Sequence, residues 1–276
     1  MGFNKERIPM NTILDVAIQS ARSAGEVIVE AIQHIETIKF QEKAPFDFVS
    51  EIDRQSETII MQMIRQHYPD HTILSEESGS STHNPSSDYL WIIDPLDGTT
   101  NFLHAVPHCA ISIGIQYQNH LQYAVVYDPI RRELFTATQG QGAKLNNKVI
   151  QVSQQPQLKG SLLGTGYPYR NMDYLEPYIA TFKALIPETV GIRRCGSAAL
   201  DLAYIACGRF DGFWEFQLKP WDIAAGILLI QEAGGSVVNM KGLSANCLED
   251  ADIIAGNPTV AKELLAIVQR HNLSKK

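Results

Sequence analysis

The sequence contains no uninterrupted apolar run of about 18 residues, which is the length that a membrane-spanning helix requires. It also begins without the apolar segment of a signal peptide, and Glu6 stands where a myristoylation motif requires serine or threonine. We therefore expect neither a membrane span nor a lipid anchor. Residues 1–9 precede the first periodic helix and are predicted to be an N-terminal extension.

Cysteine and positive charge are also scarce. The four cysteines are scattered and include no Cys-x-x-Cys pair, so we expect free thiols in a reducing cytoplasm. The net charge of −7 argues against broad binding to nucleic acid or to anionic membranes. Internal repeats, low-complexity tracts and long linkers are absent. Residues 10–276 are therefore predicted to form a single domain, with room for subdomains over about 10–145 and 146–276.

The most informative segment is residues 94–102, which read Asp-Pro-Leu-Asp-Gly-Thr-Thr-Asn-Phe directly after an apolar, strand-like run. Mg²⁺ prefers oxygen ligands, and Asp94 and Asp97 supply carboxylates close together. Pro95 has a fixed φ and no N–H, which allows the carbonyl of Leu96 to turn toward the same ion. The first half of the segment therefore predicts a site for hard cations.

The second half of this segment is suited to an anion. Gly98 allows the backbone to approach a ligand closely, and Thr99 can begin a helical turn whose free N–H groups attract a phosphate. The alternative is an ordinary turn, because Asp-Pro and Asp-Gly are common turn dipeptides. We favour the metal and phosphate interpretation, because a plain turn needs neither the second aspartate nor the threonine pair.

Two other segments offer further carboxylates. A predicted strand at residues 72–75 ends at Glu76-Glu77, and we expect one glutamate to point inward while the other stays in solvent. Asp222 lies at the start of a helix that follows Pro220 and ends at Gly234-Gly235. The alternatives are a solvated loop acid for Glu76 and a helix cap for Asp222. Because residues 94–102 already indicate a metal site, ligation of a metal is the better interpretation of both Glu76 and Asp222.

These segments together resemble the inositol monophosphatase family of Mg²⁺-dependent, lithium-sensitive phosphatases. Its two signature stretches correspond to residues 91–102 and 221–226, and residues 164–168, 193–201 and 208–215 resemble the bacterial inositol-1-monophosphatase branch. The resemblance covers nearly the whole chain. It implies an α+β fold, a layered α/β sandwich of alternating helix and sheet layers, with the metal site where two sheet systems meet.

The resemblance also implies roles for individual residues. Two or three Mg²⁺ ions would be bound by Glu76, Asp94, Leu96, Asp97 and Asp222. Catalysis would depend on Asp94 and on Thr99, which works with Glu76 to orient and activate the attacking water. The backbone N–H groups of Gly98 and Thr99, beside Asp97, would hold the phosphate.

Substrate contacts are implied for Gly196, Ser197, Ala198 and Glu215, of which Glu215 would hydrogen-bond a substrate hydroxyl. Ser197 stands where some relatives have threonine. Asp53 matches an acid behind the metal ligands, although Ser50-x-x-Asp53 also reads as a helix capping box. Lys43 corresponds to a family lysine near the phosphate, but the surrounding stretch differs between branches, so we leave it outside the predicted site.

The predicted function is Mg²⁺-dependent hydrolysis of a small phosphomonoester, with myo-inositol 1-phosphate favoured, by direct attack of water and without a phosphoenzyme. The single domain would then be catalytic. Fructose 1,6-bisphosphate, another sugar phosphate and histidinol phosphate are alternative substrates. The family also implies a homodimer. An alternative of another class is a regulatory factor that binds the transcription and ribosomal-RNA machinery.

Periodicity predicts the remaining elements. Apolar residues repeat at helical spacing over residues 13–32 and 59–64. Strands are predicted at 109–117, 121–128 and 133–138, as part of an antiparallel meander. Beyond the meander, apolar runs near 161–164, 211–216 and 252–255 alternate with helices near 173–185, 197–207, 222–233 and 258–270.

Two further features remain open. His104 and His108 have the spacing of some zinc sites, but the intervening Val106-Pro107 disfavours a regular helix. We therefore do not predict a metal site from this pair. Arg193-Arg194 could bind phosphate or pair with acids, and the sequence does not distinguish the two.

Overall fold

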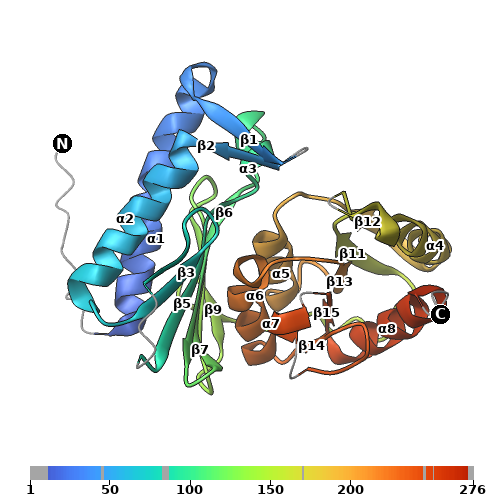
Figure 1. Ribbon diagram of the computed structural model, residues 1–276. Helices are drawn as coiled ribbons and strands as arrows, with labels where there is room; N and C mark the ends of the chain where they lie inside the picture. Colours follow the sequence, from blue (N-terminus) through green and yellow to red (C-terminus); the bar gives the residue numbers. More distant parts are fainter. Residues whose placement is uncertain are drawn as a thin grey trace.

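The computed structural model describes residues 12–44, 47–82, 87–169, 171–244, 247–250 and 252–272 (Figure 1). The extension predicted at residues 1–9 lies outside this described part. Among the described helices, none is long and apolar enough to cross a membrane. Helices and sheets alternate in layers from one side of the molecule to the other, which confirms the predicted α+β architecture.

The first layer is a pair of long helices, α1 (Ile13–Ala31) and α2 (Glu51–His67). The predicted helical spacing is confirmed, because α1 buries Val16, Ala17, Ala21, Ala24 and Ile28 along one side. Thr12 begins this helix by accepting a hydrogen bond from the backbone N–H of Asp15 at 3.1 Å. Together α1 and α2 cover one face of the first sheet.

The first sheet has eight strands in the order β10-β9-β8-β7-β6-β5-β3-β4. Their bounds are Thr72–Ser75 (β3), Gly79–Thr82 (β4), Tyr89–Asp97 (β5), Ala110–Tyr117 (β6), His120–Asp128 (β7), Glu133–Thr138 (β8), Ala143–Leu145 (β9) and Lys148–Ile150 (β10). The predicted meander is present in β6, β7 and β8, which pair antiparallel. β3 instead pairs in parallel with β5, so Glu76, which directly follows β3, and Asp94 lie at the same end of these two strands.

Two helices, α5 (Ala198–Ala206) and α6 (Pro220–Glu232), form the central layer between the sheets (Figure 1). α6 lies against β6 so closely that a Cβ on Gly114 would be 2.6 Å from Cβ of Ala224. A larger residue than glycine would push the helix away from the sheet. This contact fixes the position of α6 relative to β5 and β6.

The second sheet has five strands in the order β12-β11-β13-β15-β14. They are Ser161–Thr165 (β11), Thr189–Arg193 (β12), Gly212–Glu215 (β13), Ser236–Val238 (β14) and Ile253–Gly256 (β15). α5 packs on its inner side, while α8 (Pro258–Asn272), with α4 (Leu175–Leu185) against it, forms the outer layer. The order of layers is therefore helix pair, sheet, helix pair, sheet, helix pair.

Several short elements complete the described chain. They are the hairpin β1 (Phe40–Ala44) and β2 (Asp47–Ser50), the short helices α3 (Thr99–Leu103) and α7 (Cys247–Asp250), and the 3-10 turns η1 (Ile32–Thr37), η2 (Met172–Tyr174) and η3 (Ile186–Glu188). The hairpin begins where η1 ends and leads directly into α2. It therefore lies at the same end of the molecule as the start of α2 and the short helix α3 (Figure 1).

Candidate active site

A cavity of about 450 Å³ opens where the end of β5, the start of α5 and the start of α6 meet. Every residue of the predicted site except Asp53 contributes to its lining. These residues are Glu76, Asp94, Leu96, Asp97, Gly98, Thr99, Gly196, Ser197, Ala198, Glu215 and Asp222. Five separate parts of the chain therefore contribute to one cavity: Glu76, residues 94–99, residues 196–198, Glu215 and Asp222.

Asp94 and Asp97 reach the same cavity because β5 is irregular between them. Asp94 pairs with Ser112 of β6 and Asp97 pairs with Ala110, so β5 has one residue more than its partner over this stretch. In a regular strand, residues three apart point to opposite faces. The extra residue is a bulge, and it brings both carboxylates to one side.

The turn after this bulge has the conformation that its sequence predicts. The backbone N–H of Leu96 donates to Oδ1 of Asp94 at 3.0 Å, which holds the bend. Gly98 has φ of 96°, in the left-handed region that favours glycine. α3 then begins at Thr99, and the N–H of Phe102 closes its first turn on the carbonyl of Gly98.

Burial disfavours the charged forms of Asp94 and Asp97. It is the main reason that the pKa of Asp94 is raised well above its ordinary value, and the neighbouring Glu76 raises that pKa further. Burial likewise raises the pKa of Asp97 to about 6, although hydrogen bonds at 2.7 Å from the hydroxyl of Ser197 and the N–H of Ala199 oppose the rise. Such a cluster is suited to a bound cation, which would compensate the negative charges.

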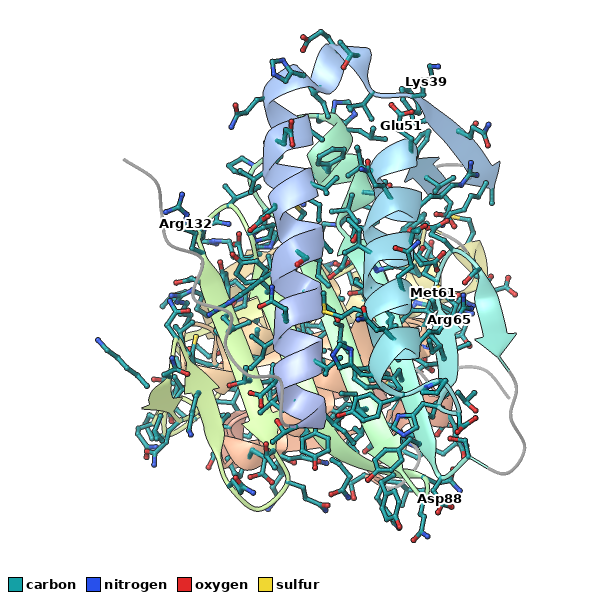
Figure 2. All side chains as sticks on the ribbon, turned by 90° about the vertical axis from the view of Figure 1, so that its left-hand side faces the viewer. Lys39, Glu51, Met61, Arg65, Asp88 and Arg132 are labelled. Carbon is teal, nitrogen blue, oxygen red and sulfur yellow. The ribbon has the colours of Figure 1, made fainter. Side chains whose placement is uncertain are left out.

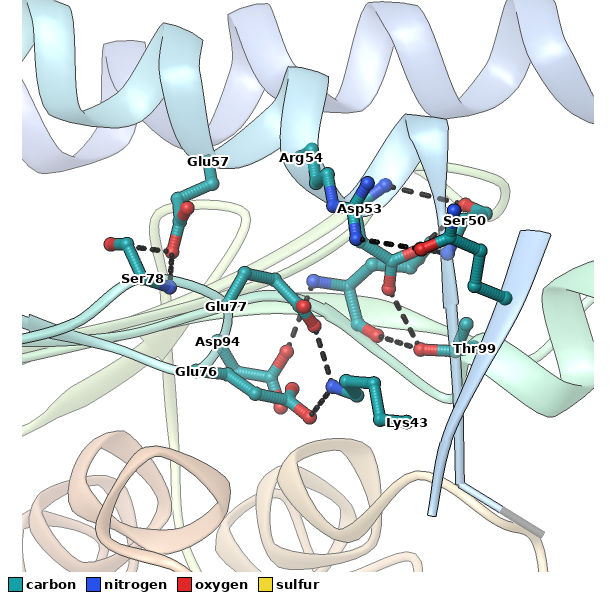
Figure 3. A network of polar contacts seen from close by, with 12 residues as sticks. Lys43, Ser50, Asp53, Arg54, Glu57, Glu76, Glu77, Ser78, Asp94 and Thr99 are labelled. Atoms are coloured by element: carbon teal, nitrogen blue, oxygen red, sulfur yellow. Dashed lines mark hydrogen bonds and ion pairs between the residues drawn. The ribbon is translucent and has the colours of Figure 1, made fainter. Parts of the chain in front are cut away.

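The glutamate pair differs from the prediction. We expected one glutamate to stay in solvent, but the side chains of Glu76 and Glu77 are only 15% and 6% exposed. Lys43 of β1 lies over both and contacts their carboxylates at 3.0 and 2.8 Å (Figure 3). The physical reason is the β1–β2 hairpin, which covers the loop after β3 and brings a cation to both acids. Burial nevertheless raises the pKa of Glu77 to about 7.

Asp53 serves two interactions at once. Its Oδ2 accepts from the backbone N–H of Ser50 at 2.8 Å, which makes the predicted capping box of α2. Its Oδ1 lies 2.8 Å from the hydroxyl of Thr99, which also lies 3.1 Å from the carbonyl of Leu96 (Figure 3). Asp53 therefore lies behind the cavity and contacts it through Thr99.

Asp222 occupies the first turn of α6. Its Oδ2 accepts from the backbone N–H of Lys219 at 2.6 Å, so the capping role is present together with a place in the cavity lining. The hydroxyl of Ser112 donates to the carbonyl of Trp221 at 3.1 Å, which ties the start of α6 to β6. Asp222 is thus both a helix cap and a cavity residue, so the two interpretations that the sequence allows are compatible.

The far side of the cavity is formed by the second sheet and the start of α5. Ser197 is the N-cap of α5, and Gly196 before it has φ of 91°. Glu215 ends β13, and a Cβ on Gly166 would come within 1.9 Å of its carboxylate. Gly166 thus leaves the room that Glu215 occupies. Burial raises the pKa of Glu215 well above its ordinary value, with a smaller contribution from Asp222.

Several lining residues were not predicted from the sequence. Arg194, whose role was left open, packs its guanidinium 4.5 Å from the ring centre of Tyr167, and both line the cavity. Asp201 also lines it; the stretch 193–201 resembles the bacterial branch of the family, but the resemblance implies no role for Asp201 itself. Tyr167 lies in residues 164–168, which resemble the bacterial branch of the family, and this resemblance is the signal that could have identified it.

The structure brings His108, but not His104, into a group of possible metal-binding side chains. Among the described residues, His108, Cys195 and Asp201 form a group that could hold a metal ion, with ligand atoms within 4.8 Å of one another. Cys109, Cys195 and Cys207 are free cysteines. The group was not predictable, because His108 precedes β6 whereas Cys195 follows β12 and Asp201 lies in α5.

Comparison with known proteins gives a consistent result. A model of the inositol monophosphatase family matches residues 10–273. The chain is 49% identical over 265 residues to the Nus factor SuhB of Pseudomonas aeruginosa, which covers 95% of this chain and 97% of that protein.

Solved structures agree with this match. The extragenic suppressor protein suhB of Bartonella henselae superposes with a TM-score of 0.90 at 39% identity, covering 94% of this chain and 98% of that one. An inositol monophosphatase from Anabaena gives a TM-score of 0.82 at 38% identity, covering 95% and 97%. The likeness therefore extends over the full layered fold.

Proposed function

The chain belongs to the inositol monophosphatase family, and we propose that it catalyses Mg²⁺-dependent hydrolysis of a small phosphomonoester, with myo-inositol 1-phosphate as the favoured substrate. The observation that carries the proposal is the convergence of Glu76, Asp94, Asp97 and Asp222 in one cavity. These four acids come from three segments, and no single local turn would account for their meeting.

The donor set fits magnesium. We propose Glu76, Asp94, Asp97, Asp222 and the carbonyl of Leu96 as ligands for two or three Mg²⁺ ions. All of them are oxygen donors, which Mg²⁺ prefers. The raised pKa values of Asp94 and Asp97 support the same assignment, because a cation would stabilise their charged forms. When bound, Mg²⁺ supplies an activated water and stabilises negative charge on the leaving oxygen.

The residues of the chain provide positioning and proton transfer. The Thr99 hydroxyl can donate to Asp53, which leaves its oxygen lone pairs able to accept a hydrogen bond from a water in the cavity. Glu76 lines the same cavity and is the second group proposed to orient that water. The N–H groups of Gly98 and Thr99, at the turn into α3, are proposed to hold the phosphate.

We propose that substrate selectivity resides on the side of the cavity opposite the proposed metal ligands. Glu215, Gly196, Ser197 and Ala198 line that side, and the buried carboxyl of Glu215 supports recognition of a hydroxyl group. Fructose 1,6-bisphosphate, other sugar phosphates and histidinol phosphate remain alternative substrates, since one hydroxyl often changes selectivity by only about 1–3 kcal/mol. Phosphate release should be compared across these substrates with Mg²⁺. The family assignment leads us to propose inhibition by lithium in the same assay.

The decisive variant is Asp94→Asn, which keeps the shape of the side chain and removes its charge. We expect phosphate release to be abolished while the fold is retained. Asp88→Asn is the matched control, because Asp88 is exposed and lies at the opposite end of the sheet (Figure 2). Near-wild-type turnover by Asp94→Asn would overturn the metal assignment. Incorporation of ¹⁸O from water into the alcohol instead of the phosphate would overturn direct attack on phosphorus.

A regulatory function is the second candidate, and the name of the relative from Pseudomonas aeruginosa, Nus factor SuhB, favours it. We propose that this chain also contacts the transcription machinery, as a function separable from hydrolysis. Asp94→Asn should then lose turnover and still bind a purified bacterial transcription elongation complex. If wild-type protein does not bind the complex, the second function is wrong.

Two further properties belong to the same proposal. On the basis of the family assignment, we propose that the protein forms a homodimer. Light scattering across micromolar concentrations tests this, and a single species of monomer mass would refute it. We also propose a cytoplasmic location. The free thiols of Cys109, Cys195 and Cys207 support a reducing compartment.

A further inference from the structure

The side chains of His108, Cys195 and Asp201 meet near the start of α5. Nε2 of His108 lies 3.9 Å from Oδ1 of Asp201, and the sulfur of Cys195 completes a group whose ligand atoms lie within 4.8 Å of one another. His108 and Asp201 are only 8% and 2% exposed. The group is therefore largely removed from water.

The thiol of Cys195 hydrogen-bonds to the side chain of Asp201, but two other polar atoms of the group have unmet hydrogen-bonding capacity. Nε2 of His108 and Oδ1 of Asp201 are both buried without a hydrogen-bond partner among the described residues. Leaving such atoms unsatisfied is costly, and each unsatisfied group in a native structure calls for an explanation, such as an ion. Both atoms lie in the same group, so one ligand would satisfy both.

The backbone around the group is fixed. Nδ2 of Asn101 donates to the carbonyl of His108 at 2.8 Å and to the carbonyl of Cys195 at 2.9 Å. The ring of His108 also packs edge-on against Tyr204 at 5.9 Å. The segment before β6 and the segment after β12 are thus joined by a single amide.

We propose that His108, Cys195 and Asp201 form a binding site for one Zn²⁺ ion, distinct from the proposed magnesium centre. Zinc accepts imidazole nitrogen, thiolate sulfur and carboxylate oxygen at about 2.0–2.3 Å. Tetrahedral ligands at these lengths are about 3.3–3.7 Å apart, so the 3.9 Å between Nε2 and Oδ1 must shorten by a few tenths of an ångström, and the pairs that include the sulfur, which lie within 4.8 Å, by up to about 1 Å. Magnesium, by contrast, prefers oxygen donors alone.

Charge balance favours a divalent ion here. Burial lowers the pKa of His108 to about 4, so its imidazole is neutral at pH 7. Burial also raises the pKa of Cys195 to about 12 and that of Asp201 well above its ordinary value. Entry of Zn²⁺ would release the thiol proton of Cys195, and the thiolate and the carboxylate of Asp201 would together balance its two charges.

The site adjoins the substrate side of the cavity. Asp201 contributes to the cavity lining, whereas His108 and Cys195 lie behind it. Cys195 directly precedes Gly196 and Ser197, which are proposed substrate contacts. Occupancy by zinc would therefore restrain the loop that receives the substrate.

Binding can be measured without reference to activity. Co²⁺ serves as the probe in the presence of saturating Mg²⁺, because a cobalt–thiolate bond gives an intense near-ultraviolet absorption band. We expect the wild-type protein to show this band at one Co²⁺ per chain and to lose it on addition of Zn²⁺. Cys195→Ser should lose the band and weaken Zn²⁺ binding by more than about 100-fold. This loss is larger than the loss that typically follows mutation of a residue that only hydrogen-bonds to a metal ligand.

Controls separate this site from other thiols and from the magnesium centre. Cys207→Ser removes a free thiol outside the group, and Asp94→Asn removes a proposed magnesium ligand; both should keep the band. His108→Gln provides a second test that leaves the thiol in place, and it should weaken binding even if Cys195→Ser does not fold. A band that persists in Cys195→Ser, or the absence of a band in the wild-type protein, would overturn the proposal.

Discussion

The hydroxyl of Thr99 lies 2.8 Å from Oδ1 of Asp53, a residue 46 positions earlier in the chain. Asp53 uses its other oxygen to cap α2. The position of the Thr99 hydroxyl is therefore set by the start of a long helix in the first layer.

Removing this hydroxyl should slow catalysis without greatly weakening substrate binding. We expect Thr99→Val to lower kcat by about 10²–10⁴-fold, the usual contribution of a positioned proton-transfer group. Thr99→Ser keeps the hydroxyl and should retain most of the turnover. The measurement is kcat and KM for phosphate release with Mg²⁺. Equal rates for the valine and serine variants would show that the hydroxyl has no such role.

The carboxylate cluster should reduce stability when no cation is present. Each like-charged pair at about 5 Å repels by roughly 1–3 kcal/mol in a surface-like to watery dielectric. Asp94→Asn should therefore unfold at a higher temperature than the wild-type protein in EDTA. The order should reverse when Mg²⁺ is added, because the variant binds it poorly. A variant that is less stable in EDTA would contradict this account.

The close contact between β6 and α6 should not tolerate an added methyl group. Gly114→Ala is expected to destabilise the fold by about 1–3 kcal/mol, as overpacking usually does. It should also weaken Mg²⁺ activation, because Ala224 lies two residues after Asp222. The double variant Gly114→Ala with Ala224→Gly moves the methyl group from α6 to β6. Urea unfolding should show that the double variant recovers much of the stability lost in Gly114→Ala. No recovery would mean that the backbone atoms of α6 dominate the clash.

Acid should weaken the first layer through His71. Nδ1 of His71 accepts a hydrogen bond from the indole N–H of Trp91 at 2.9 Å, and the ring stacks between Tyr68 and Tyr89. Burial lowers the pKa of His71 below 6.5. The associated stability is therefore present above pH 6.5 and is lost as the pH falls through the lowered pKa.

A variant can isolate this effect. His71→Asn retains an acceptor for Trp91 and does not titrate. Between pH 7.5 and pH 5, the wild-type protein should lose more unfolding free energy than the variant, by an amount on the order of one hydrogen bond, about 1 kcal/mol. Urea unfolding followed by tryptophan fluorescence provides the comparison. Identical losses in the two proteins would exclude His71 as the cause.

Much of the fold could be predicted from local patterns. The spacing of buried residues in α1 and the strands β6, β7 and β8 follow directly from periodicity. The hairpin β1–β2 could not be predicted, because every described residue of β1 is exposed and the strand shows no alternation of apolar and polar residues. Without this hairpin, the burial of Glu77 beneath Lys43 could not be predicted either.

The site was predictable where its chemistry is local. Residues 94–102 contain two acids, a glycine turn and a threonine in sequence, and the structure keeps them together. The bulge that aligns Asp94 with Asp97 depends on pairing with β6, which no local pattern reveals. The group of His108, Cys195 and Asp201 depends on contact between two sheet systems, and its members have no common motif.

The wide separation of the four acids in the sequence has a consequence for synthesis on the ribosome. Glu76, Asp94 and Asp97 are made early, whereas Asp222 follows Asp97 by 125 residues (222 minus 97). A nascent chain that has completed β5 therefore carries only part of the cluster, and the full repulsion arises only when α6 docks against β6. Magnesium present at that moment would favour the final docking step, so the ion would act on the maturation of the protein as well as on its reaction.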